Sequence, residues 1–527
     1  MTGGGKRIGM ATDHTKFNRI AILDYGSQYT QLIARRIREQ QVFSEIIRFD
    51  TPAAKLRENL PQGIILSGGP NSVFEEGAPG IDPGIFELGV PVLGICYGMQ
   101  LMSQHLGGKV VPGESREYGK TEMVTEPDNE LFAGMPGRFI VWMSHGDRVE
   151  RIPEGFKVSA SSANCPYAAI RNEQKRFYAI QFHPEVVHTQ FGSQIIGNFL
   201  FKVCGCKADW KISTWIDDTV EKIRAQVGGE EVVLGLSGGV DSSVAAVLLH
   251  KAIGTRLHCI FVDNGLLRLE EDLQVERMFK AKLGLDLHVA HAAGRFYEAL
   301  KGVSEPELKR KIIGREFINV FAEEARRFKS AKFLGQGTIY PDVIESSSAL
   351  KGPSQTIKSH HNVGGLPPDL KFELVEPLRD LFKDEVRAVG RVLGIDSELL
   401  DRQPFPGPGL GVRILGEVTE EKVRLLQQAD VRVQEEVRKL PDYKSLWQTF
   451  AVLLPVKTVG VMGDQRTYEY TCAIRSVDSI DAMTADWSRL PYETLATISN
   501  RIINEVRGIN RVVYDISSKP PATIEWE

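Results

Sequence analysis

The sequence predicts an α/β protein with two parallel-sheet domains, followed by a smaller α+β domain. Short apolar runs that end in glycine or polar residues alternate with segments of helical length along most of the chain, which is typical of parallel sheets. The chain has 527 residues, of which 42% are hydrophobic, and this length is too great for a single core. We expect domains at residues 19–207, 208–402 and 403–527, after an extension at residues 1–18 that lacks periodicity and is expected to be mobile.

The composition excludes several classes of protein. Lys and Arg number 64 against 68 Asp and Glu, so the net charge of -4 gives no general basic field for binding nucleic acid. No apolar run is long enough to span a membrane, and the N-terminus lacks the apolar core of a signal peptide. Six cysteines are too few for a disulfide framework in this length, and Cys204 and Cys206 are too close together and too isolated for zinc. We therefore expect a cytoplasmic protein with no membrane or nucleic-acid partner.

The first domain begins with three short apolar runs, at Ile20–Tyr25, Gly63–Pro70 and Pro91–Gly98. Helical segments separate them, and this alternation predicts a parallel α/β sheet. In such sheets the loops at the carboxyl ends of the strands form the functional site. We therefore look for chemistry where these runs end.

Cys96 lies at the end of the third run, in G-I-C-Y-G-M-Q, with a helical segment after it. This spacing predicts a sharp strand-to-helix turn, where helix-terminal N–H groups favour a thiolate. Downstream, F-H-P-E places His183 and Glu185 after the β-prone segment Phe177–Phe182. Cysteine, histidine and a carboxylate are the parts of a thiolate nucleophile, its base and the group that orients the base. Taken singly, a buried cysteine is more often a small hydrophobe, and a lone histidine a satisfied polar group.

The two motifs together resemble the class I glutamine amidotransferases over about residues 19–207. The resemblance implies that Cys96 attacks the side-chain amide of glutamine, with His183 as its base and Glu185 as the orienting carboxylate. It also implies an oxyanion hole made by the backbone N–H groups of Gly69, in S-G-G-P, and Tyr97. The stretch S-H-G-D at 144–147 resembles a further family signature beside the glutamine pocket, with a polar loop as the alternative; we assign His145 no chemical step.

A second motif, V-V-L-G-L-S-G-G-V-D-S-S, begins at Val232. It predicts a strand that ends at Leu236, a glycine-rich turn from Ser237 to Ser243, and a helix from Val244. Glycines let the backbone approach a ligand closely, and a helix N-terminus attracts anions. The turn is therefore suited to phosphate, with a magnesium ion at Asp241. A turn that merely closes a βα unit is the alternative.

The turn lacks the lysine of the common nucleotide triphosphatase loop and resembles the pyrophosphate loop of the ATP pyrophosphatases. The resemblance implies binding of ATP and transfer of AMP to a substrate oxygen. Asp263, at the end of the strand in Cys259–Gly265, is expected beside the nucleotide, and Lys383, one turn into a helix, is expected at its phosphates. A solvated lysine paired with Glu385 or Glu376 is the alternative for Lys383. The expected ATP-binding residues are Ser237, Gly238, Gly239, Val240, Asp241, Ser242, Ser243, Asp263 and Lys383.

Two segments between the motifs need separate interpretation. Residues 207–229 form a predicted helical connection between the two α/β domains. Ile357–Pro367 contains the adjacent histidines His360 and His361, which face opposite ways on a strand and make a poor metal pair. We expect this segment to be a polar lid over the nucleotide.

The C-terminal part begins with the Pro- and Gly-rich stretch Arg402–Arg413, which predicts a domain boundary. The order F-P-G-P-G-L-G-V-R, V-G-V-M-G-D, S-N-R-I-I-N-E-V and K-P-P-A-T-I-E-W-E resembles the family of glutamine-hydrolysing GMP synthases, and with the earlier motifs this resemblance covers nearly the whole chain. It implies a homodimer through the third domain, whose end binds xanthosine monophosphate; a frayed chain end is the alternative. The implied nucleotide contacts are Arg310, Arg413, Lys519, Ile524 and Glu525.

A glutaminase joined to an ATP pyrophosphatase implies one overall reaction. Ammonia from glutamine needs an activated carbon, and AMP on an oxygen makes that oxygen a good leaving group. The family resemblance names the acceptor as xanthosine monophosphate and the products as GMP, AMP, pyrophosphate and glutamate. Two alternatives stay open: another glutamine-fed ATP pyrophosphatase such as an NAD synthetase, and a non-catalytic nucleotide sensor.

Overall fold

The computed structural model describes residues 17–347, 370–462, 465–479 and 484–527. These fall into two compact units: residues 17–215 with 340–347, and residues 216–339 with the described residues from 370 onward. Of the extension expected at residues 1–18, the part up to residue 16 lies outside the described residues, as does the expected lid at Ile357–Pro367 with His360 and His361. Contrary to the expectation, Phe17 and Asn18 are not mobile, because Phe17 is buried against Trp210 and the Asn18 N–H donates to Asp209. Within the described part of the chain, no helix is both long and apolar enough to cross a bilayer.

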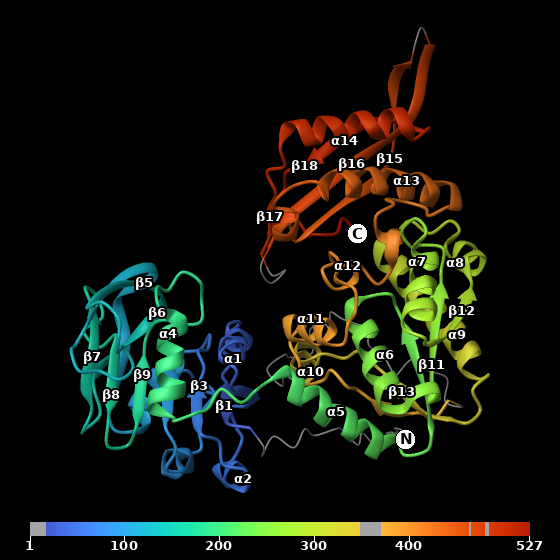
Figure 1. The fold of residues 1–527 in the computed structure, drawn as a ribbon. Helices are drawn as coiled ribbons and strands as arrows, with labels where there is room; N and C mark the ends of the chain where they lie inside the picture. Colours follow the sequence, from blue (N-terminus) through green and yellow to red (C-terminus); the bar gives the residue numbers. More distant parts are fainter. Residues whose placement is uncertain (1–16, 348–369, 463–464, 480–483) are drawn as a thin grey trace. The chain divides into compact units, whose positions relative to one another are not determined.

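The N-terminal unit is built on one nine-stranded sheet of order β2-β1-β3-β4-β9-β8-β7-β5-β6 (Figure 1). Its strands are β1 (Arg19–Asp24), β2 (Phe43–Arg48), β3 (Gly63–Leu66), β4 (Val92–Ile95), β5 (Lys109–Thr125), β6 (Arg138–Arg151), β7 (Lys157–Ser162), β8 (Ala169–Asn172) and β9 (Phe177–Ile180). Its helices are α1 (Thr30–Glu39), α2 (Ala53–Glu58), η2 (Pro83–Glu87), α3 (Tyr97–His105), α4 (Gly192–Gly197), η3 (Asn198–Val203) and α10 (Tyr340–Ser347).

The expected parallel sheet accounts for only part of these strands. The pairs β1–β2, β1–β3, β3–β4 and β4–β9 are parallel, as predicted from the three apolar runs. Strands β8, β7, β5 and β6 extend the sheet by antiparallel pairs, which we did not predict. Their signal is different: β6 has buried residues at alternate positions, as in a sheet with one face toward solvent.

The second unit contains a five-stranded parallel sheet of order β12-β11-β10-β13-β14, in agreement with the prediction. The strands are β10 (Glu231–Leu236), β11 (Leu257–Asp263), β12 (Asp286–His291), β13 (Ala331–Gly335) and β14 (Glu373–Val375). The accompanying helices are α6 (Val240–Ile253), η4 (Gly254–Arg256), α7 (Glu271–Glu276), η5 (Arg277–Lys282), α8 (Ala293–Leu300), α9 (Pro306–Ala325), α11 (Lys383–Val392), α12 (Ser397–Leu400) and η7 (Gly409–Val412).

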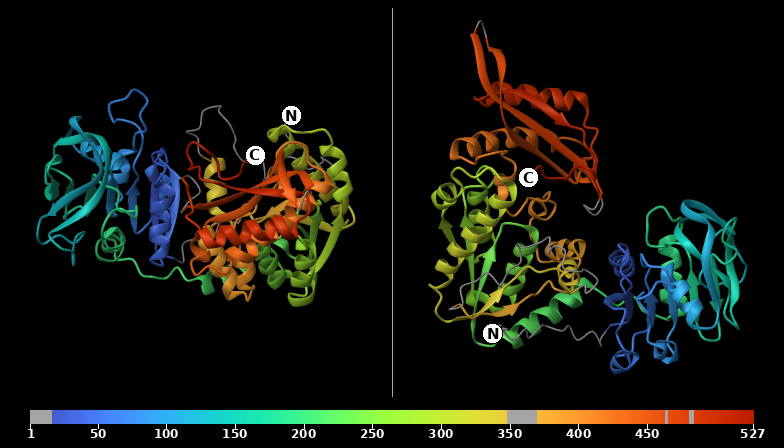
Figure 2. Two further views of the ribbon diagram at one scale, coloured as in Figure 1. Left: turned by 90° about the horizontal axis from the view of Figure 1, so that it is seen from above. Right: turned by 180° about the vertical axis from the view of Figure 1, so that it is seen from behind.

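A smaller α+β layer completes this unit. Strands β15 (Gln448–Met462) and β16 (Gln465–Asp478) form a long antiparallel hairpin that extends beyond helix α14 (Figures 1 and 2). The remaining elements are α13 (Glu420–Val437), η8 (Tyr443–Ser445), β17 (Asp486–Trp487), α14 (Tyr492–Glu505) and β18 (Ile509–Asp515). One hydrophobic core runs from Ile260 in the parallel sheet to Ile474 and Ile498 in this layer. The boundary expected near residue 402 stays a prediction.

The connection between the α/β parts is helical over a shorter stretch than expected. Helix α5 spans Ile212–Val227, whereas residues 207–211 are not helical. Trp210 explains the difference, because its buried ring packs against Phe17 and Phe43 and its backbone N–H donates to the carbonyl of Gln41. Tertiary packing here overrides the helical preference of the segment.

Candidate active site

Cys96 stands alone between β4 and α3, on a sharp turn. Its φ of 53° and ψ of -108° are unusual for a residue other than glycine. The flanking glycines permit the turn: a Cβ on Gly98 would lie 2.3 Å from the carbonyl oxygen of Leu66, and one on Gly94 would lie 2.7 Å from that of Gly98. The turn predicted from G-I-C-Y-G is therefore present, and it places the thiol at the N-terminus of α3.

His183 and Glu185 form a buried pair beside this turn. The His183 Nδ1 lies 2.7 Å from Glu185 Oε1, and both side chains are almost fully buried. The backbone positions the pair, since the His183 N–H donates to the Trp142 carbonyl at 3.0 Å and Arg36 Nε donates to the Glu185 carbonyl at 3.1 Å. Burial by itself lowers the pKa of His183, but the Glu185 carboxylate and the Cys96 thiol outweigh it and hold that pKa well above its ordinary value. A protonated imidazole beside the thiol is the arrangement that stabilises a thiolate.

The S-G-G-P turn packs against the same groups. A Cβ on Gly68 would lie 3.1 Å from His183 Cε1, and one on Gly69 would lie 2.8 Å from the Tyr25 carbonyl oxygen and 3.3 Å from Tyr97 Cγ. The two expected oxyanion donors, Gly69 and Tyr97, therefore come from segments in direct contact. Their role in stabilising an oxyanion stays a prediction.

The S-H-G-D stretch lies on strand β6, so its alternative reading as a polar loop is wrong. Its Ser144 carbonyl oxygen is 3.7 Å from Cys96 Sγ, which places the stretch beside the nucleophile. His145 points to other partners: Nδ1 lies 3.0 Å from the Asp147 carbonyl oxygen, and Nε2 lies 3.3 Å from Glu117 Oε2. Strand pairing with β5 explains why these residues are not in a loop.

The pyrophosphate-loop residues follow strand β10, which ends at Leu236 as predicted. Helix α6 begins at Val240, not at the expected Val244, so Asp241, Ser242 and Ser243 form its first turn. The Ser243 N–H already donates to the Gly239 carbonyl at 3.1 Å, and the Ser242 and Ser243 hydroxyls donate to the same oxygen at 3.2 and 2.6 Å. Gly238 has a φ of 71°, which only glycine adopts without strain.

Lys383 faces this loop from helix α11. It is the first residue of the helix and not one turn into it, because the Phe382 N–H is capped by Glu385 Oε2 at 2.9 Å. Its ammonium lies 3.7 Å from Asp241 Oδ2. The alternative partners bind other groups: Glu385 caps the helix, and Glu376 accepts a hydrogen bond from Thr338 at 2.7 Å. Asp263 ends β11, as predicted.

The chain end is packed into the second unit, so the frayed-tail alternative is wrong. Arg413 is fully buried and donates from Nε and Nη2 to the two oxygens of Glu525, at 3.1 and 2.9 Å. Arg310 donates to the Glu527 carbonyl, and Ile524 is buried. Four of the five expected substrate contacts therefore gather at the chain end. The fifth, Lys519, joins Ala485 through two backbone hydrogen bonds.

Comparison with known proteins agrees with this geometry. The family model described as glutamine amidotransferase class-I matches residues 21–203, NAD synthase matches 210–311, and the GMP synthase C terminal domain matches 435–526. A GMP synthase [glutamine-hydrolyzing] of Maridesulfovibrio salexigens is 60% identical over 97% of this chain and 99% of its own length. The chain belongs to the glutamine-hydrolysing GMP synthases. The relatives of the same name from Brachyspira hyodysenteriae and Lactobacillus acidophilus are 58% and 56% identical, over 97% and 98% of this chain and 99% and 100% of theirs.

Sequence reasoning missed several charged residues of this GMP synthase. Lys309 has a fully buried side chain that donates to Glu527 and, at 2.7 Å, to the Ile414 carbonyl. Buried Arg475 donates to the carbonyls of Ser517 and Thr523 at 2.6 and 3.1 Å. The sequence offered two signals for these residues: Lys309 stands in a K-R-K run, and Arg475 stands within an apolar strand. A charge that is buried in such a setting requires a partner, so either residue could have been expected to form an ion pair or hydrogen bonds.

Two further arginines lie between the pyrophosphate loop and the chain end. Arg402 donates to the Gly238 carbonyl at 3.4 Å and pairs with Glu271. The Arg268 guanidinium lies 4.4 Å from the Phe405 ring centre. Burial, together with the neighbouring charge of Arg402, lowers the pKa of Arg268 to about 10. A group of partly buried cations is a favourable setting for a phosphate.

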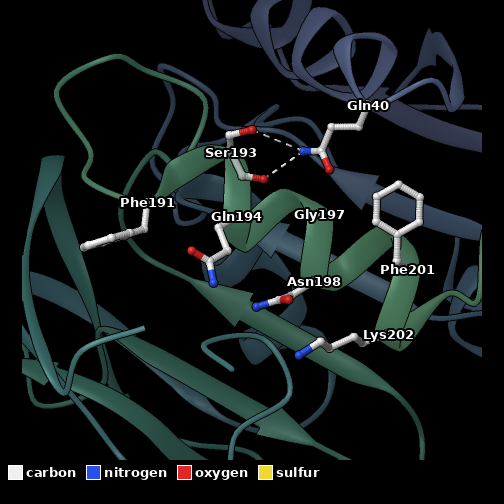
Figure 3. A pocket seen from close by; sticks show the side chains of 8 residues that line it. All are labelled: Gln40, Phe191, Ser193, Gln194, Gly197, Asn198, Phe201 and Lys202. Atoms are coloured by element: carbon white, nitrogen blue, oxygen red, sulfur yellow. Dashed lines mark hydrogen bonds between the residues drawn. The ribbon is translucent and has the colours of Figure 1, made fainter. Parts of the chain in front are cut away.

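A pocket on helices α4 and η3 lies apart from the catalytic candidates. It is lined by Gln40, Phe191, Ser193, Gln194, Gly197, Asn198, Phe201 and Lys202 (Figure 3). Gln40 Nε2 donates to the Ser193 carbonyl at 2.7 Å across it. None of Cys96, His183 and Glu185 lines this pocket, so it has no part in the site described above.

Proposed function

We propose that the two sites act in sequence to aminate xanthosine monophosphate. The chain is a GMP synthase that uses ATP and hydrolyses glutamine. The observation that carries the proposed division of labour is the presence of a Cys–His–Glu arrangement in one unit and an S-G-G-x-D-S loop at a helix N-terminus in the other. Ammonia made at the first site is used at the second.

At the first site, the Cys96 thiolate attacks the side-chain amide carbon of glutamine. The Gly69 and Tyr97 N–H groups hold the oxyanion, and protonated His183 gives its proton to the departing ammonia. His183 then takes a proton from water, which attacks the thioester and releases glutamate. Glu185 keeps the imidazole oriented throughout, through its 2.7 Å contact with Nδ1.

At the second site, the loop residues Ser237 to Ser243 hold the phosphates of ATP while the purine 2-oxygen attacks the α-phosphorus. Pyrophosphate leaves, and ammonia then displaces AMP to give GMP. Backbone N–H groups at the start of α6 and the Lys383 ammonium favour the negative charge of the phosphates. Asp263, at the end of the adjacent strand, is proposed to contact the nucleotide.

Magnesium fits the groups that the loop offers. The Asp241 carboxylate is partly exposed on the first turn of α6, and Ser237 and Ser242 add hydroxyl oxygens within 2.9 Å of each other. Hard oxygen donors beside phosphate are the environment that magnesium prefers. When bound at Asp241, the ion would neutralise charge on the pyrophosphate leaving group.

We propose that xanthosine monophosphate binds beside the chain end, through Arg310, Arg413, Lys519, Ile524 and Glu525. Support comes from the cations gathered there, since Arg268, Arg402 and Arg413 all lie between the pyrophosphate loop and the last residues. We also propose a cytoplasmic location, because all six cysteines are free thiols, as a reducing compartment favours.

One assay tests the whole proposal. Purified chain is given xanthosine monophosphate, magnesium-ATP and glutamine, and products are separated by chromatography. Equal amounts of GMP, AMP, pyrophosphate and glutamate are expected. ADP in place of AMP, or an unchanged purine with another amidated acceptor, would contradict it.

The chain-end proposal predicts a specific effect of one carboxylate. Glu525→Gln keeps the side-chain shape but removes the carboxylate proposed to accept hydrogen bonds from the ribose hydroxyls or a purine N–H, so xanthosine monophosphate should bind about tenfold more weakly, equivalent to about 1.4 kcal/mol. Calorimetric titration measures this affinity. Glu527→Gln is the matched control, since that carboxylate pairs with Lys309. Equal affinities in both variants and the parent chain would place the substrate elsewhere.

We propose a homodimer formed through the β15–β16 hairpin. Val459 and Tyr468 are directly paired across it and Val461 shares their face; all three side chains are largely exposed, at 48%, 63% and 72%. Such an apolar face indicates a protein interface. We expect Val461→Glu to raise the dimer dissociation constant about tenfold or more in analytical ultracentrifugation. Glu469→Gln, on the opposite face, should change nothing, and an equally stable Val461→Glu dimer would exclude this interface.

A further inference from the structure

His258, Asp286 and His288 form a cluster that the reaction does not use. The strand register places His258 of β11 beside Asp286 of β12, and His288 follows two residues later on the same face. His258 Nδ1 lies 2.6 Å from Asp286 Oδ2, and His288 Nε2 lies 3.1 Å from Asp286 Oδ1. Two imidazoles and a carboxylate with their donor atoms within 4.8 Å of one another form a possible metal-ligand set.

Neighbouring residues hold the cluster in place. Glu231 Oε2 lies 3.3 Å from His258 Nε2, and Ser330 Oγ donates to the same carboxylate oxygen at 2.5 Å. The Phe328 ring stacks on His258 with centres 4.4 Å apart. A carboxylate on the far nitrogen of a histidine is the usual second partner of a metal-binding imidazole.

The nitrogens proposed as ligands both face Asp286. His258 Nδ1 and His288 Nε2 each approach one of its two carboxylate oxygens, while His258 Nε2 faces Glu231. The donor separations of 2.6 and 3.1 Å need only small adjustments to reach the about 3.3 Å between ligands of a tetrahedral zinc ion. Asp286 is partly exposed, with 43% of its side chain accessible, so water can complete the coordination.

We propose that His258, Asp286 and His288 bind one zinc ion, with Glu231 orienting His258. These residues lie in the first three positions of strands β10, β11 and β12, whereas the pyrophosphate loop follows the carboxyl end of β10. The ion would therefore join the edge strand β12 to β11 at the amino ends of the strands, the end opposite the pyrophosphate loop. We expect it to stabilise this unit and to take no part in the chemistry.

Zinc binding to the untagged full-length chain at neutral pH tests the proposal. In equilibrium dialysis, Asp286→Asn and His288→Gln should each bind one zinc ion fewer than the parent chain. Glu231→Gln should still bind this ion, but about tenfold to 100-fold more weakly. His188→Gln, which removes an exposed histidine elsewhere, should behave as the parent chain. The midpoint of thermal unfolding should rise with zinc in the parent chain but not in the two ligand variants.

Cobalt substitution distinguishes this cluster from a second one. Glu117, His145 and Cys165 also lie within ligand distance of each other, but their set contains sulfur. Cobalt at the proposed site should give visible absorption without the near-ultraviolet charge-transfer band of a thiolate ligand. A thiolate band alone, no bound zinc, or equal zinc binding by the parent chain and His288→Gln would each overturn the proposal and leave the cluster as a hydrogen-bonded ion pair network.

Discussion

The Cys96→Ala variant is expected to lose glutamine-dependent GMP synthesis entirely while it retains synthesis from ammonium. The thiol is the proposed nucleophile, so its loss removes the covalent step at the amide carbon. The residues proposed for adenylation lie in the other unit, so we expect adenylation not to depend on the thiol. The rates of AMP and GMP formation are measured once with glutamine and once with ammonium chloride as the nitrogen source.

A matched control comes from another cysteine of the same unit. Cys206 is also buried, but its backbone N–H bonds to the Leu200 carbonyl and it lies outside the catalytic group. Cys206→Ala should therefore leave the rates of GMP synthesis from glutamine and from ammonium near those of the parent chain. Equal loss of the glutamine and ammonium reactions in Cys96→Ala would mean that the two chemistries are not divided as proposed.

The nucleophile turn was predictable because its determinants are local. Gly94 and Gly98 flank Cys96 in the sequence, and both are required by close approach of backbone atoms, so the motif carries its own geometry. The same holds for the strand that ends at Leu236. In short motifs of this kind, steric limits on neighbouring residues determine the turn, so it can be predicted without knowing distant contacts.

Distant partners explain what sequence reasoning missed. The antiparallel extension of the first sheet depends on which strands pair, such as β6 with β5 and β8 with β9. Lys309 and Glu527 meet across 218 positions, and no local pattern pairs such residues.

The Asp241→Asn variant should lose adenylation with either nitrogen source. The substitution keeps the side-chain shape on the first turn of α6 but removes the charge proposed to hold magnesium at the pyrophosphate, so AMP formation should fall by about two orders of magnitude or more. Because the lost group acts through magnesium, additional magnesium should restore part of the rate. Glutamine hydrolysis in the other unit should persist, which shows that the protein is folded.

Asp384 offers a control in an equivalent position, since it is the second residue of helix α11 as Asp241 is the second residue of α6. Asp384→Asn makes the same change of charge at a helix N-terminus, and it should leave AMP formation within about twofold of the parent rate, because surface helix-terminal charges contribute little. Release of labelled pyrophosphate from ATP, measured with xanthosine monophosphate present and glutamine absent, isolates the adenylation step. If Asp241→Asn releases pyrophosphate at the parent rate, the carboxylate only shapes the loop, and magnesium must be held by the phosphates and other residues.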